Sequence, residues 1–216
     1  MTLLGLDTST AASAACVLRS GGEWFEHVPP PARLAEPPGH GRELLPAVVD
    51  VMTRAGVGWQ DLDAVAVGRG PGAFTGLRVG IATARALAHA AGVPLRGVSS
   101  LAALALGAGA EPALAVIDAR RGEVFAALDG VLDPWVGPPG ELLARVGSRA
   151  QRAVGDGSVR FREVLEAGGI EVPPASSTLH VVRALHVCRL AEGVPGGPPE
   201  TVLPDYLRDP DAVALP

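Results

Sequence analysis

The sequence contains no lysine and no asparagine, and all 18 of its basic residues are arginines. A Walker A phosphate-binding loop requires a Gly-Lys-Ser/Thr sequence, so the absence of lysine excludes that class of nucleotide-binding loop. The 23 acidic residues give a formal net charge of −5, and the arginines form no basic stripe. Because nucleic-acid binding depends on clustered positive charge, such a chain is a poor candidate for holding RNA or DNA by itself.

Cysteines and long apolar runs are also scarce. No apolar run reaches the length of a membrane-spanning helix, so we expect no membrane partner. The two cysteines, Cys16 and Cys188, lie far apart and form no CxxC pair, so we interpret both as small buried hydrophobic side chains. Met1 is followed directly by the strand-like segment LLGLD without a basic region, which predicts no signal peptide and a cytoplasmic protein.

The five histidines show neither HxxxH nor HExxH spacing, which two metal ligands on one helix face would need. The sequence therefore predicts no metal site, and we interpret the histidines as surface or helix-capping residues. No GxSxG segment is present either, so no Ser-His-Asp arrangement can be inferred. We accordingly predict no catalytic residue on this chain.

Apolar residues make up 48% of the 216 residues, which is enough for one domain or two small ones. Apolar and alternating runs predict strands at 3–7, 14–19, 23–28, 64–68, 95–98, 113–118 and 123–128. Helical periodicity predicts helices at 40–55, 75–91, 99–106, 141–146, 160–167 and 179–192, with a loop at 29–39. This order predicts an α/β protein of two related lobes, residues 1–103 and 104–202, with a tail at about 203–216 that could return to the first lobe.

One glycine-rich segment, Gly68–Gly80 (GRGPGAFTGLRVG), follows a predicted strand and opens a predicted helix that Thr75 is expected to cap. Such a loop can bind a phosphate through backbone N–H groups, and Gly70 and Gly72 are the candidate contacts. The spacing does not match GxGxxG. The alternative, that the glycines of the helix let it pack closely on the sheet, stays open.

The run Asp7-Thr8-Ser9-Thr10 supplies a second candidate phosphate contact at the end of the first predicted strand. A carboxylate followed by hydroxyl groups suits magnesium–phosphate contacts in a hairpin loop. The alternative is a turn whose side chains bind their own backbone, which is common for these residue types. The sequence does not decide between the two.

Two predicted helices are more apolar than packing on a sheet requires. Apolar residues of 41–55 cover about 200° of the helix, where about 100° suffices, and Leu45 and Val49 are the surplus. On 76–91 the polar groups Arg78, Arg85 and His89 form one narrow stripe, with Thr83 roughly opposite. An exposed apolar face usually marks an interface, although other parts of the chain could cover it. The predicted partner contacts are Leu45, Val49, Met52, Arg78, Ala82, Arg85 and His89.

Taken together, these segments resemble one protein family over nearly the whole length. The resemblance is carried by LLGLDTST at 3–10, HGRELLPAV at 40–48, AVGRGPGAFTGLRVGIATARALA at 66–88, GVSSLAALA at 97–105, DARRGEVFAAL at 118–128 and LPDYLRDPDA at 203–212. The succession is similar to the TsaB (YeaZ) family, and GPGAFTGLRVG is its most specific part. Residues from about 130 to 200 match only loosely.

The resemblance implies two actin-like lobes of the ribonuclease H-like, sugar-kinase and heat-shock-chaperone superfamily. It also implies a catalytic paralogue, TsaD, that transfers threonylcarbamoyl to the adenosine next to the anticodon of tRNA. This chain would bind and activate TsaD as a non-catalytic subunit, the ATPase TsaE would join, and tRNA would be held only through the complex. ATP or ADP is expected, if anywhere, at the junction with the partner, and a homodimer is expected when the chain is alone.

The chain departs from the catalytic paralogue at two places. The metal-binding HxxxH of that paralogue corresponds here to Ser100 and Leu104, and leucine cannot ligate a metal. The second glycine-rich nucleotide loop corresponds to Asp118–Glu123 (DARRGE), which no longer forms a glycine cradle but carries two arginines. An autonomous actin-like ATPase or kinase is therefore the weaker alternative, and a glycoprotease-like peptidase is weaker still.

Overall fold

The computed structural model describes residues 1–109 and 112–208, which form two β-sheets with helices between and around them. The first sheet has the order β3-β2-β1-β4-β5. Strands β1, β2 and β3 pair antiparallel, whereas β1, β4 and β5 pair parallel. The bounds of its strands are Leu3–Asp7 (β1), Ala14–Leu18 (β2), Trp24–His27 (β3), Ala64–Gly68 (β4) and Leu95–Val98 (β5).

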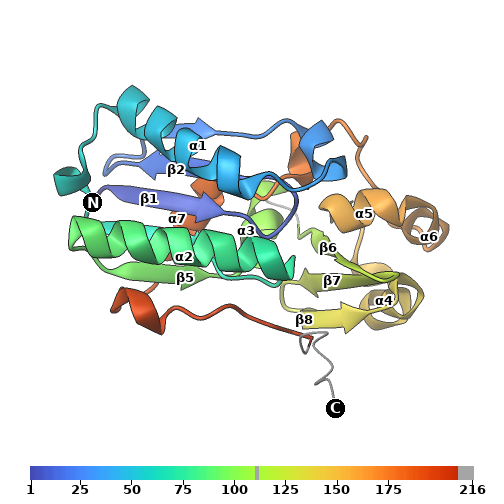
Figure 1. The fold of residues 1–216 in the computed structure, drawn as a ribbon. Helices are drawn as coiled ribbons and strands as arrows, with labels where there is room; N and C mark the ends of the chain where they lie inside the picture. The colour runs from blue at the N-terminus through green and yellow to red at the C-terminus, as the bar shows by residue number, and fades with distance from the viewer. Residues whose placement is uncertain (110–111, 209–216) are drawn as a thin grey trace, which may run out of the picture.

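Helices cover both faces of the first sheet, so its central strands are apolar throughout rather than alternating. Helices α1 (His40–Ala55) and α2 (Phe74–Ala91) lie on one face, where Leu4 and Leu6 of β1 contact them. Leu3 points to the other face, which α3 (Ser100–Gly107) and α7 (Ala184–Glu192) cover. Figure 1 shows α1 and α2 in front of the sheet with α3 and α7 behind it.

The second sheet has the order β8-β7-β6-β9, in which β6, β7 and β8 pair antiparallel and β6 and β9 pair parallel. This repeats the pairing pattern of the first four positions of the first sheet. The predicted α/β fold with two related lobes is therefore confirmed. The strand bounds are Leu114–Arg120 (β6), Glu123–Leu128 (β7), Leu132–Gly137 (β8) and Ala153–Val154 (β9).

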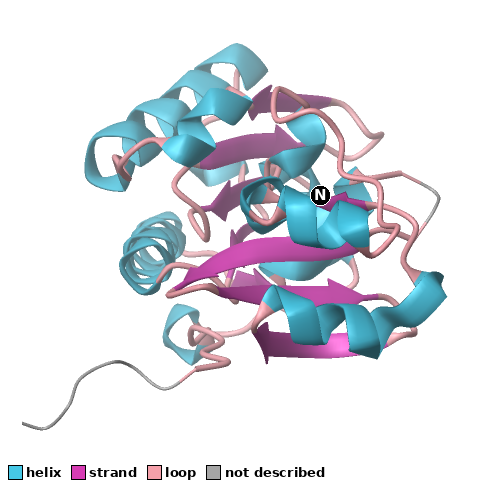
Figure 2. Ribbon diagram, turned by 90° about the vertical axis from the view of Figure 1, so that its right-hand side faces the viewer, coloured by secondary structure: helices cyan, strands magenta, loops and turns pink. Residues whose placement is uncertain are grey.

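One layer of helices serves both sheets. Leu101 of α3 and Leu185 of α7 belong to a single apolar cluster with Leu3 of the first sheet and Ile117 of the second. The outer face of the second sheet is covered by further helices, and helices lie on both sides of the strands in Figure 2. These are α4 (Pro139–Val146), α5 (Asp156–Arg160) and α6 (Arg162–Ala167).

Local sequence explains where the two long helices end. Gly56 after α1 and Gly92 after α2 adopt left-handed backbone with φ of 61° and 68°, and each donates its N–H to carbonyls of the last turn. The start of α2 differs from the prediction, because the helix begins at Phe74 and Ala73 precedes it without a side-chain cap. Thr75 lies inside the first turn, so the predicted cap is wrong.

Several predicted elements need correction in the second half and the loops. The predicted loop at 29–39 contains a short 3-10 helix, η1 (Pro31–Ala35), and β8 was not predicted. The predicted helix at 160–167 is broken between Arg160 and Arg162, and the one at 179–192 is divided into η4 (Thr178–His180) and α7. The remaining 3-10 helices are η2 (Trp59–Asp61), η3 (Gly147–Arg149) and η5 (Pro199–Thr201).

The predicted lobe boundary between residues 103 and 104 falls within α3, in the shared helical layer, and it stays a prediction. The tail returns to the first lobe at Asp205, whose N–H donates to the carbonyl of Arg69 at 2.7 Å, and Arg208 pairs with Glu123 of the second lobe at 2.8 Å. The rest of the predicted tail, 209–216, lies outside the described residues. Within 1–109 and 112–208, none of the helices combines the length and hydropathy needed to cross a bilayer.

Candidate functional site

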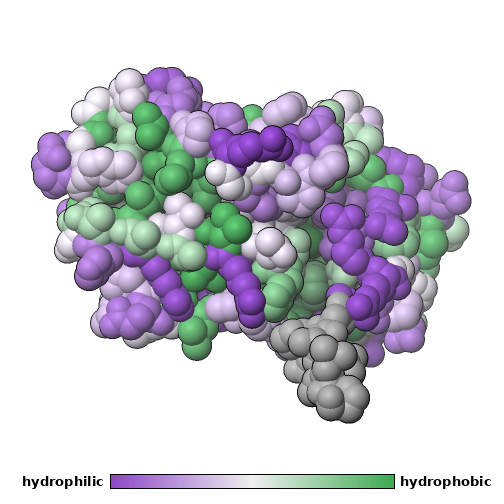
Figure 3. All heavy atoms as spheres, in the orientation of Figure 1, coloured by the Kyte–Doolittle hydropathy of each residue, from purple (hydrophilic) through white to green (hydrophobic). Residues whose placement is uncertain are grey.

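The outward side of α1 and α2 carries apolar side chains that no other described segment covers. Leu45 is 52% exposed and Val49 is 56% exposed, one turn apart on α1, and Ala82 on the neighbouring helix α2 is also exposed. Figure 3 shows hydrophobic residues gathered over α1 and α2 on this side of the molecule. We call the surface formed by Leu45, Val49 and Ala82 the α1–α2 face.

Met52 does not belong to this face. Its side chain is only 5% exposed and packs in the core beneath α1, so the predicted partner contact is corrected to a core residue. The reason lies in the helix geometry, because Met52 stands four residues after Val48, on the buried side of α1, whereas Val49 is turned outward.

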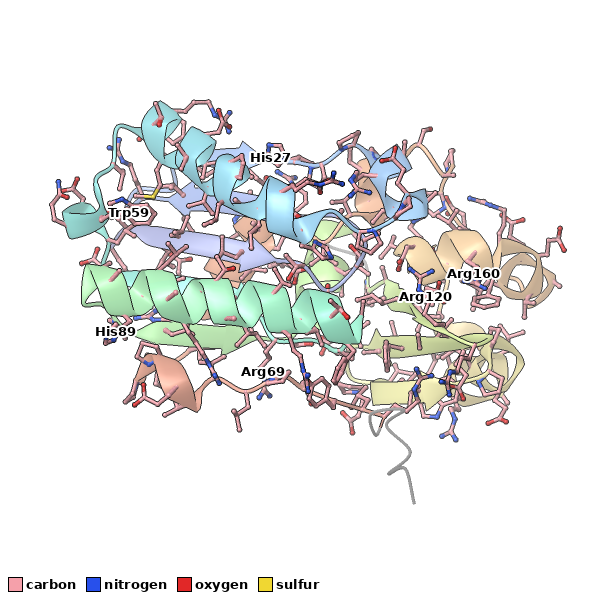
Figure 4. All side chains as sticks on the ribbon, in the orientation of Figure 1. His27, Trp59, Arg69, His89, Arg120 and Arg160 are labelled. Carbon is pink, nitrogen blue, oxygen red and sulfur yellow. The ribbon has the colours of Figure 1, made fainter. Side chains whose placement is uncertain are left out.

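The predicted polar stripe of α2 contacts the C-terminal segment of the same chain. Arg85 donates from Nη2 to the carbonyls of Val202 at 2.6 Å and Glu200 at 3.1 Å. Arg78 is exposed and donates from Nε to the hydroxyl of Tyr206 at 3.1 Å. His89 is exposed near the end of α2, as Figure 4 shows.

Asp7-Thr8-Ser9-Thr10 forms a closed and buried turn between β1 and β2. The carboxylate of Asp7 accepts hydrogen bonds from the Ser9 N–H at 2.8 Å, the Ser9 hydroxyl at 2.7 Å and the Ser100 hydroxyl at 2.8 Å. Burial raises the pKa of Asp7, while these hydrogen bonds act in the opposite direction. Both carboxylate oxygens therefore have partners within the chain.

The glycines of the Gly68–Gly80 segment lie against this turn. A Cβ on Gly72 would overlap the carbonyl of Ser9, and one on Gly76 would overlap the carbonyl of Thr8. A Cβ on Gly80 would overlap the Thr8 hydroxyl, which donates to the Gly76 carbonyl at 2.8 Å. The space in front of these three glycines is thus filled by the chain itself. Position 70 requires glycine for a different reason, because its backbone φ is 112°, which other residues rarely adopt.

A cleft lies between the two lobes and contains two adjoining cavities of about 440 and 620 Å³, both lined by Asp118 and Arg120. The buried carboxylate of Asp118 pairs with Arg160 at 2.8 Å and with Arg120 at 3.1 Å. Arg120 and Arg121 have left-handed backbone, with φ of 65° and 55°. Non-glycine residues rarely adopt this conformation, and the turn holds both arginines at the cleft. Figure 4 places Arg120 and Arg160 close together between β6 and α5.

Asp156, the first residue of α5, lines the smaller cavity. Its Oδ1 accepts hydrogen bonds from the N–H groups of Asp118 at 3.1 Å and Gly157 at 2.9 Å. Burial, with the nearby Asp118 charge adding to it, raises the pKa of Asp156 to about 6 despite those hydrogen bonds. Among residues 1–109 and 112–208, no three His, Cys, Asp or Glu side chains group closely enough to hold a metal ion.

Comparison with known proteins identifies the family. A family model for TsaD, tRNA N6-adenosine threonylcarbamoyltransferase, matches residues 35–173. The tRNA threonylcarbamoyladenosine biosynthesis protein TsaB of Escherichia coli is 41% identical over 131 residues, which are 58% of this chain and 53% of that protein. The solved structure of YeaZ from Pseudomonas aeruginosa is 34% identical with a TM-score of 0.74, covering 95% of this chain and 99% of that one. This chain belongs to the TsaB (YeaZ) family.

The share of each relative's length that this chain matches differs from one relative to the next. The matched region spans about half the length of the Escherichia coli TsaB. An uncharacterised protein of Mycobacterium tuberculosis is 36% identical over 218 residues, 99% of this chain and 95% of that protein. The predicted family is confirmed, and the similarity to the solved YeaZ extends through both lobes.

The residues expected to stand where the catalytic paralogue has its metal ligands and second nucleotide loop make contacts within this chain. Ser100, at one expected metal-ligand position, donates its hydroxyl to Asp7, and Leu104, at the other, is buried in the shared helical layer. The loop Asp118–Glu123 ends at the interlobe cleft with its arginines, as described above.

Sequence reasoning missed Asp156 and Arg160. A signal was present, because Gly155-Asp156-Gly157 follows the short strand β9 and places a carboxylate at a helix start. The strand is only two residues long, however, and its hydrophobicity does not distinguish it from a loop.

Proposed function

We propose that this chain is the non-catalytic partner of a TsaD-like subunit, which it binds through the α1–α2 face and activates for threonylcarbamoylation of the adenosine next to the anticodon of tRNA. The observation that carries this proposal is the exposure of Leu45 and Val49 on a helix whose opposite side is fully packed. Full burial of a Leu or Val side chain contributes about 1.5–3 kcal/mol, and these two half-exposed side chains forgo part of that free energy, which a partner can recover. Family membership supports a TsaD-like subunit as that partner.

The closed Asp7 turn supports the absence of catalysis on this chain. Asp7 is satisfied by Ser9 and Ser100, and Thr8 and Ser9 fill the space before the glycines, so a phosphate entering there would have to displace them. The proposal includes the remaining expectations, namely a TsaE-like ATPase in the assembly, ATP or ADP at the subunit junction and tRNA held only through the complex.

The test replaces the exposed side chains by a charge. Leu45→Glu and Val49→Glu should each weaken binding to the TsaD-like subunit by at least about 30-fold, because a buried hot-spot side chain contributes about 2 kcal/mol or more. Binding is measured by isothermal titration of the purified subunits. Modification of tRNA by the reconstituted proteins should fall in parallel.

The matched control is Val164→Glu, which places the same charge at an exposed apolar position on α6 of the other lobe. This variant should bind like the wild type. If Leu45→Glu and Val49→Glu bind as tightly as Val164→Glu, the α1–α2 face is not the partner surface. If the wild type does not stimulate tRNA modification by the partner proteins, the proposed function itself is wrong.

A further inference from the structure

The C-terminal residues 197–208, here called the C-terminal strap, run along α2 and are held there at several points. Gly197 forms a bridge with Leu95 of β5, and Arg85 binds the carbonyls of Glu200 and Val202. Asp205 binds the backbone of Arg69, whose side chain is labelled beside the strap in Figure 4. The strap is therefore a fixed part of the surface that contains α2.

At the N-terminal end of α2, the strap completes a cluster of two rings and a guanidinium. The rings of Phe74 and Tyr206 lie 5.3 Å apart between centroids and are tilted by 30°. The guanidinium of Arg78 lies 3.8 Å from the centre of the Phe74 ring and donates to the Tyr206 hydroxyl. Each of the three side chains thus restricts the orientation of the other two before a partner binds.

This cluster remains open to solvent despite its internal contacts. Phe74 is 38% exposed and Tyr206 is 37% exposed. Phe74 and Arg78 belong to the same helix as Ala82, one turn beyond Arg78, so the cluster continues the α1–α2 face along α2. Tyrosine and arginine are enriched among the side chains that dominate binding energy, and a side chain already fixed loses little entropy on binding.

We infer that the Phe74–Arg78–Tyr206 cluster is a second anchor for the same TsaD-like subunit, and that the strap supplies its tyrosine. This inference rests on the proposed function, because it assigns further contacts to the same partner. It also gives Arg78 a positioning role, in which it orients Tyr206. The strap continues from Tyr206 to Arg208, which pairs with Glu123 of β7 at 2.8 Å, so this anchor is tied to the second lobe as well.

The experiment measures binding of the TsaD-like subunit by isothermal titration with the full-length variants Tyr206→Ala and Phe74→Ala. Each should weaken binding by about tenfold or more, the range expected when an anchoring aromatic side chain is truncated. Two variants are used because Phe74 lies on α2 and Tyr206 on the strap, so a loss of affinity in both would not depend on the folding of one segment alone. Thermal unfolding of each variant checks that the fold is retained.

The matched control is Trp24→Ala, which removes an exposed ring that also stacks with an arginine, Arg189. Trp24 pairs with Leu18, whose side chain faces the α3–α7 layer, so this ring lies on the side of the sheet away from α1 and α2. Wild-type affinity is expected for this control. Wild-type affinity of both Tyr206→Ala and Phe74→Ala, alongside lost binding by Leu45→Glu, would overturn the second anchor alone. Absence of binding by the wild type would overturn both proposals.

Discussion

His186 packs against α3, with its ring close to the backbone of Gly107, and it is almost fully buried. Burial lowers its pKa to about 4, and the positive charges of Arg183 and Arg189 act in the same direction. His40 and His180 are buried too, and burial lowers the pKa of each. The interpretation of the histidines as surface or capping residues is therefore wrong for these three, while His27 and His89 are exposed.

The low pKa of His186 predicts acid sensitivity. Its folded pKa of about 4 lies below its ordinary value of 6.5, so the unfolded chain binds more protons and stability falls as the pH drops from 6.5 towards 4. At pH 5 this histidine should cost about 2 kcal/mol of unfolding free energy relative to pH 7.5. His186→Gln should reduce the difference between urea unfolding curves at the two pH values by about that amount.

An unchanged pH dependence in His186→Gln would show that this imidazole is not held neutral in the folded protein.

At the scale of elements, the first lobe could be predicted closely from the sequence and the second only in part. Strands β1 and β4 and helix α1 have long apolar patterns and glycine stops, so local signals determine their bounds. Strand β8 contains Pro134, a residue that is uncommon within strands, and tertiary pairing with β7 determines this strand instead. Leu45 and Val49 could be predicted to be exposed because the apolar arc of α1 exceeds what a sheet covers. The inward position of Met52 could not, because it depends on how the helix is rotated on the sheet.

The glycines of α2 lead to a prediction about how this helix packs. Gly76→Ala adds a methyl group where the Thr8 carbonyl lies, so it should destabilise the protein by about 1–3 kcal/mol even though alanine favours helix formation. The matched control is Gly41→Ala on α1, where an added Cβ would contact no other atom. The free energy of unfolding of this variant should be unchanged or should rise by up to about 1 kcal/mol. Urea unfolding gives the free energy of unfolding of each variant. Equal stability of the two variants would contradict the close packing of α2 on the β1–β2 turn.

At the scale of the whole molecule, one exposed apolar surface can serve more than one partner. Without the TsaD-like subunit, the α1–α2 face of one molecule can cover the same face of a second, which a two-fold symmetric dimer permits. We expect size-exclusion chromatography with light scattering to show a dimer for the isolated wild type and a monomer for Leu45→Glu. Adding the TsaD-like subunit should dissociate the homodimer. A homodimer that persists with the partner bound would mean that the homodimer surface and the partner-binding surface are distinct.

The helical layer shared by the two sheets has a consequence for how this protein could activate another. Hinge-like rotation of one lobe would separate Leu3 of the first sheet from Ile117 of the second, which share one apolar cluster, so lobe opening would expose part of that common core. We therefore expect the chain to act as a rigid template, whose influence on a partner comes from the shape that it imposes and not from a movement of its own.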